Sequence, residues 1–68
     1  MRTKYAIQYD MIVKLANIKK FIDDTAQAVI HEQDSIISNN IETISEYLDS
    51  LVNDTDDLSY ILMQETKA

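Results

Sequence analysis

Acidic side chains are the residues of this chain best placed to act on another molecule. The carboxylates of Glu42, Glu46, Asp49 and Asp56 follow one another at helical spacing, so they would line one outward face of a helix. Clustered negative charge attracts cationic surfaces and speeds their association. We therefore expect these four residues to bind a protein partner with a basic surface, and the alternative is that they form a solvated outer helix face.

A second group of metal-ligating residue types occurs at His31, Glu32 and Asp34. Di-metal sites in helical bundles need Glu-x-x-His pairs on facing helices, and calcium sites need a fixed cage of oxygens. The chain has one His and no such pair, so we expect no metal and no cofactor. Nucleophilic catalysis needs an oriented base, and phosphate-binding loops need glycine, which is absent. We therefore do not expect an enzyme.

The composition favours a small, soluble, all-α protein. The 68 residues include no Gly, Pro or Cys, which removes the residues of tight β-turns and of disulfide or cysteine-zinc sites. No apolar run approaches the roughly 20 residues of a membrane span, and no stretch has the layout of a secretory signal. With a net charge of −6 and no single basic face, we expect a cytoplasmic protein that binds neither a membrane nor nucleic acid directly.

Two series of residues with heptad spacing predict two long helices. The first series ends at Ile36, and the second begins in a different phase at Ile41. Cap-forming Ser and Asn residues occupy positions 38–40 between them. We expect an antiparallel helical hairpin with helices at about 3–37 and 40–65 and a turn at 38–40. The predicted contact positions are Gln8, Met11, Leu15, Ile18, Ile22, Thr25, Val29, Glu32 and Ile36, and then Ile41, Ile44, Leu48, Leu51, Thr55, Leu58 and Leu62.

A run of cap-forming residues at 53–57 offers an alternative, in which the second helix breaks and a short third helix begins. The heptad phase continues unchanged across this run, which a loop would have no reason to preserve. The continuous helix is therefore favoured.

The apolar face is wider than one two-helix hairpin can cover. Apolar residues also occupy positions beside the predicted contacts, and a core of this size supplies only about 3–5 kcal/mol. A second copy of the chain is the simplest cover, so we expect a homodimeric four-helix bundle; scattered surface apolar residues are the alternative. The residues expected at the dimer interface are Ile7, Ile12, Phe21, Tyr47, Val52 and Ile61.

Charge is distributed unevenly along the chain. Residues 1–22 hold five of the six Lys and Arg residues, whereas residues 23–64 hold ten carboxylates and no Lys or Arg. The turn end of the predicted hairpin is therefore strongly negative. An antiparallel dimer would keep the two negative ends apart, so we expect that arrangement.

Residues 45–51 read Ser-Glu-Tyr-Leu-Asp-Ser-Leu. This segment resembles the Ser-x-x-Leu-Asp-x-Leu signature in the second helix of the small phosphatases that dephosphorylate sporulation response regulators, which are also short helical hairpins. The resemblance implies that Ser45 and Asp49 would approach a phosphoaspartate from an outer helix face. The chain departs from the signature at Glu46 and Tyr47, where Gln-Glu is usual, and it has no loop glycine.

These patterns together predict a small acidic protein-binding regulator or inhibitor that acts through a helical surface as a homodimer. Its size and composition suggest that a phage, a plasmid or a bacterial operon encodes it. The alternative functions are the aspartyl-phosphate phosphatase implied by the resemblance and a structural or assembly factor.

Overall fold

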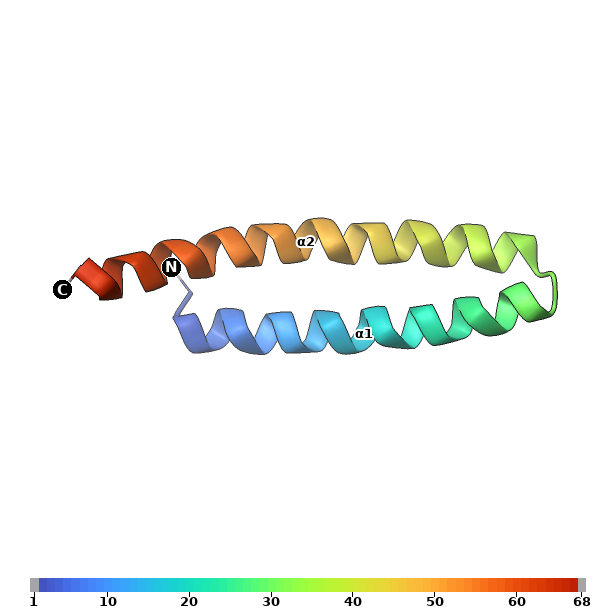
Figure 1. The fold of residues 1–68 in the computed structure, drawn as a ribbon, viewed down its shortest axis with the longest axis horizontal. Helices are drawn as coiled ribbons and strands as arrows, with labels where there is room; N and C mark the ends of the chain where they lie inside the picture. Colours follow the sequence, from blue (N-terminus) through green and yellow to red (C-terminus); the bar gives the residue numbers. More distant parts are fainter. Residues whose placement is uncertain (1, 68) are drawn as a thin grey trace.

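A computed structural model describes residues 2–67 of the protein and the side chains of residues 2–66. This part of the chain forms two helices, α1 (Lys4–Ile30) and α2 (Asp34–Lys67), and contains no strand. Figure 1 shows the helices side by side and antiparallel, with the last turns of α2 extending past the start of α1. The hairpin measures 54 × 17 × 15 Å. The predicted all-α hairpin is confirmed, and α2 continues unbroken through residues 53–57.

Thr3 fixes the start of α1. Its backbone is extended, and its side-chain hydroxyl accepts a hydrogen bond from the Ala6 N–H at 3.1 Å. This contact satisfies one of the amides that have no partner inside the first turn of a helix. The helix then runs for 27 residues without a Gly or Pro to interrupt it.

The chain turns at residues 31–33, seven residues before the predicted turn. The Glu32 N–H donates to the Val29 carbonyl at 3.2 Å, and the Gln33 N–H donates to the Ala28 carbonyl at 2.8 Å. This pair of bonds is the Schellman motif, which closes a helix around a left-handed residue. Glu32 takes that left-handed position with a φ of 56°, although glycine is the residue that adopts it without steric cost.

Gln33 directly precedes α2. Its carbonyl accepts hydrogen bonds from the N–H groups of Ile36 and Ile37, both at 3.1 Å. Asp34 adds a negative charge to the first turn of α2, where the helix dipole favours it.

The predicted helix bounds, 3–37 and 40–65, are therefore wrong at the turn. Residues 38–40 lie inside α2, and the polar residues taken for caps have other roles. Asn40 is buried between the helices, where its side-chain amide donates to the Asp24 carboxylate at 2.8 Å. The shifted turn also changes which residues face one another, and Asp54 lies opposite Lys14.

The contact between the helices follows a heptad in each of them. The residues that form this contact are spaced three and four positions apart along each helix, and every one of them is buried or half-buried. We call them the seam: Ile7, Met11, Lys14, Ile18, Phe21, Thr25 and Ala28 in α1, and Ile37, Asn40, Ile44, Tyr47, Leu51, Asp54, Leu58 and Ile61 in α2. Six of the sixteen predicted contact positions are therefore correct, Glu32 lies in the turn, and the others lie beside the seam.

The hairpin has a thin core. Its buried apolar residues are Ile7, Ile18, Ala28 and Leu51. Phe21 and Tyr47 pack across the seam with ring centroids 6.2 Å apart at a tilt of 35°, a favourable aromatic geometry. Neither helix, over the described residues, is long and apolar enough to cross a membrane.

Candidate functional site

One side of the hairpin presents a row of exposed apolar side chains. They directly follow seam residues and recur at multiples of seven positions, with Thr55 between Leu48 and Leu62, and each is between 42% and 58% exposed. We call this set the apolar side face: Leu15, Ile22 and Val29 in α1, and Ile41, Leu48 and Leu62 in α2. The two antiparallel helices are related by an approximate twofold axis normal to the plane of the hairpin. Equivalent heptad positions therefore lie on the same side of the seam, and the two rows adjoin.

The opposite side of the seam is polar. Its residues directly precede seam positions, and most are half-buried although they are polar. We call this set the polar flank: Asp10, Asn17, Asp24, Thr43, Ser50 and Asp57. The hairpin therefore partly covers polar groups on one side and leaves large apolar groups in water on the other. This is the reverse of what burial of apolar surface alone would favour.

A charge network ties the polar flank together. Asp54 is only 2% exposed, and its carboxylate accepts from the Lys14 ammonium at 2.6 Å and from the Arg2 guanidinium at 2.8 Å. Arg2 also donates to Asp10 at 2.7 Å and to Asp57 at 3.0 Å. The hydrogen bonds from Lys14 and then Arg2 lower the pKa of Asp54, while Asp54, Asp57 and Asp10 raise the pKa of Arg2. Each cation has a carboxylate partner, so this network joins the two helices and shows no free catalytic group.

The four predicted partner-binding carboxylates lie on the exposed surface of α2. Glu42, Asp49 and Asp56 repeat every seven residues on the side of α2 away from the seam, and Glu46 lies nearer the polar flank. None of the four forms an ion pair or side-chain hydrogen bond with the residues that the structure describes. We call them the acidic row, and it stays a predicted partner site.

The residues predicted for a dimer interface divide into two groups. Ile7, Phe21, Tyr47 and Ile61 are seam residues that pack within the hairpin. Ile12 and Val52 are well exposed beside the apolar side face. Leu15, Ile22 and Leu48 were predicted in the contact between the helices and lie on the surface instead, because a seven-residue repeat does not distinguish a buried row from an exposed one.

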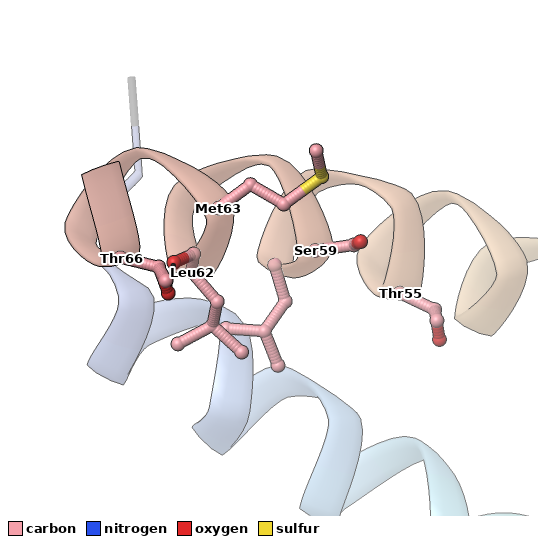
Figure 2. A pocket seen from close by; sticks show the side chains of 6 residues that line it. Thr55, Ser59, Leu62, Met63 and Thr66 are labelled. Carbon is pink, nitrogen blue, oxygen red and sulfur yellow. Dashed lines mark hydrogen bonds between the residues drawn. The ribbon is translucent and has the colours of Figure 1, made fainter.

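A shallow apolar groove lies near the C-terminal end of the apolar side face. Its volume is about 490 Å³, and it is lined by Thr55, Leu58, Ser59, Leu62, Met63 and Thr66. Figure 2 shows that Leu62 points toward the start of α1, whereas Met63 lies along α2. The lining comes from α2 alone and carries no charged group, so the groove can pack against apolar side chains but has no acid, base or nucleophile pair.

Among residues 2–67, no three His, Asp or Glu side chains lie close enough together to hold a metal ion. Comparison of the chain with protein-family models, curated proteins and solved structures finds no match. The function of the protein must therefore follow from its own surfaces.

Proposed function

We propose that the protein is a protein-binding regulator or inhibitor that acts as a homodimeric four-helix bundle. The apolar side face is the observation that carries this proposal. Six large apolar side chains at heptad spacing lie on one side of the hairpin, and its own packing leaves about half of each one exposed. Contiguous exposed apolar surface of this kind marks an interaction site in a folded protein.

The acidic row supplies the second surface of the proposed regulator. It lies on the outer side of α2, so a dimer formed through the apolar side face would leave it accessible. Its carboxylates have no cationic partner among the described residues, and their field would steer a basic protein surface toward α2. The proposed partner is therefore a protein with a basic patch.

A charge-reversal experiment tests the partner site. The variant Glu42→Lys, Asp49→Lys reverses two carboxylates on the outer side of α2. The control Asp23→Lys, Glu32→Lys makes the same change in net charge at exposed positions on α1 and in the turn. Both variants and the wild type are immobilised, and the proteins that they retain from a lysate of the native host are compared at low and moderate salt.

We expect the wild type and the control to retain the same basic protein and the acidic-row variant to lose it. Equal retention by all three would show that the acidic row is not the partner site. If the protein is instead a structural or assembly factor that binds only its own copies, the acidic-row variant and the wild type should retain the same proteins at both salt concentrations.

The phosphatase is a second candidate function. Ser45 and Asp49 lie one helical turn apart on α2, and both are exposed, so a receiver domain could reach the two side chains together. Incubation with phosphorylated receiver domains should release phosphate if this candidate is correct, and Asp49→Ala should abolish the release. An unchanged rate of phosphate loss in the presence of the protein would eliminate it.

A further inference from the structure

We infer that the apolar side face binds a second copy of the chain in antiparallel orientation, with Leu15 and Leu48 beside the twofold axis. This inference rests on the proposed homodimer and adds to it the contact face, the orientation and the central residues. Three observations support it: the exposed area of the hairpin, the chemistry of the two sides, and the distribution of charge along the rod.

The exposed area fits a dimer of ordinary interface size. A compact protein of 7.8 kDa is expected to expose about 4,400 Å², whereas this hairpin exposes 5172 Å². The excess of about 800 Å² matches the area that each partner buries in a standard-size interface. The long side of the hairpin, 54 × 17 Å, can hold a contact of this size.

The chemistry of the two sides selects the face. Beyond the apolar side face, the next positions around each helix carry the apolar residues Ile12 and Val52 and small residues such as Ser45 and Ser59, and Lys19 is the charged residue among them. A second copy approaching there would meet one charged residue per hairpin, and the exposed Lys19 side chain can keep its ammonium in water. The polar flank would instead bring Asp10, Asp57 and their Arg2 network into the contact, and desolvating such groups is costly.

Charge selects the orientation. Residues 21–45, the half of the hairpin nearer the turn, hold five carboxylates and no Lys or Arg. A parallel dimer would bring two such sets together within about one Debye length, roughly 8 Å at physiological salt. An antiparallel dimer places each set beside the open half of the other copy, residues 1–20 and 46–68, where six Lys and Arg residues nearly balance seven carboxylates. Antiparallel docking therefore separates the like charges.

The middle of the rod falls at Leu15 on α1 and Leu48 on α2, because each lies about 15 residues from the turn at 31–33. In antiparallel docking the twofold axis crosses the rods, so each helix lies over its own copy and each of these leucines faces itself. In parallel docking the axis runs along the rods, so α1 lies over the α2 of the other copy. Leu15 would then face Leu48.

Cysteine cross-linking distinguishes the two arrangements. The chain has no Cys, so Leu15→Cys and Leu48→Cys each provide one thiol per chain. Under mild oxidation we expect each variant alone to form a disulfide-linked dimer. Ala16→Cys, at the neighbouring exposed position that points away from this face, should stay unlinked. Linkage only in a mixture of Leu15→Cys and Leu48→Cys would overturn the antiparallel orientation.

A pair of lysine substitutions tests the face itself. Leu15 and Val13 are 53% and 41% exposed, and two residues of helix separate them by about 200° around the axis. Sedimentation at micromolar concentration should show dimers for the wild type and Val13→Lys. Leu15→Lys should dissociate at least tenfold more readily while its circular dichroism stays helical.

The outcomes separate this inference from the proposed function. If Leu15→Lys dimerises as tightly as the wild type, the contact lies on another face; this inference then fails while the homodimer stands. A monomeric wild type would refute both and would leave the apolar side face to a different protein. If Leu15→Lys loses its helical signal, the cross-linking results decide.

Discussion

The ion pair between Lys14 and Asp54 gives a quantitative test of the hairpin seam. Both residues occupy seam positions, where apolar side chains are the rule, and their charged atoms are 2.6 Å apart. Asp54→Leu would leave the Lys14 ammonium without its carboxylate, and that side chain is only 21% exposed. Lys14→Met would leave Asp54 with Arg2 as its remaining cation.

The expected size of the effect follows from the shape of the molecule. Breaking a fully buried ion pair costs about 3–5 kcal/mol. The hairpin is only 17 × 15 Å across, so the side chains of Lys14 and Arg2 that cover Asp54 have water beyond them. The freed Lys14 can extend into that water. We therefore expect Asp54→Leu to lower the free energy of unfolding by about 2 kcal/mol and Lys14→Met to lower it by about 1 kcal/mol.

The double variant decides the interpretation. Lys14→Met with Asp54→Leu puts two apolar side chains at facing seam positions, so its free energy of unfolding should lie within about 1 kcal/mol of the wild type or above it. Urea unfolding followed by circular dichroism measures all four proteins at one concentration, because the stability of a dimer depends on concentration. If the two losses simply add in the double variant, the residues are not coupled and the seam assignment is wrong.

The pH dependence of the stability and the backbone conformation of the turn provide two further tests. The folded-state pKa of Asp54 is lowered, so its contribution to stability is present above the unfolded-state value of about 3.9 and is lost as the pH falls through the folded-state value. Between about pH 6 and pH 3, the wild type should therefore lose more stability than the Lys14→Met, Asp54→Leu variant, and equal losses would contradict the pairing. At the turn, Glu32→Gly should raise the free energy of unfolding by about 1 kcal/mol because Glu32 has a positive φ. Gln33→Gly, at the neighbouring position where φ is negative, should not raise it, and thermal unfolding compares the two.

The helical hairpin could be predicted from the sequence, but the position of its turn could not. Heptad spacing and the absence of Gly and Pro predict long helices, and the change of heptad phase near the middle of the chain predicts that they fold back on each other. The turn at Glu32 uses a Schellman motif without the glycine that usually marks it. The Asn residues at 39 and 40 offered a stronger cap pattern, although Asn40 packs in the seam against Asp24.

The two candidate surfaces differed in how far sequence could predict them. Exposure of the acidic row depends only on the period of one helix, so Glu42 and Asp49 lie outside as expected. Exposure of the apolar side face depends on which of two neighbouring apolar rows the hairpin buries. Lys14 and Asp54 concealed the seam because charged residues rarely occupy such positions, and only the structure shows that they neutralise each other there.

In the proposed dimer, most of the residues predicted to form the contact between the helices would lie in the core of the four-helix bundle. In each helix the predicted positions comprise the apolar side face and the row of seam residues next to it. In α1, Ile22 belongs to the apolar side face and Ile18 to the seam, and in α2 the corresponding residues are Leu48 and Leu51. In a four-helix bundle formed through that face, these rows would surround the central axis, and the polar seam layers of Asp54 and Asn40 would lie toward its outside. The heptad pattern of the sequence would then describe the core of the bundle more closely than the seam of one hairpin. The polar layers would fix the register within each hairpin, and the apolar rows would supply the stability that a single thin hairpin lacks.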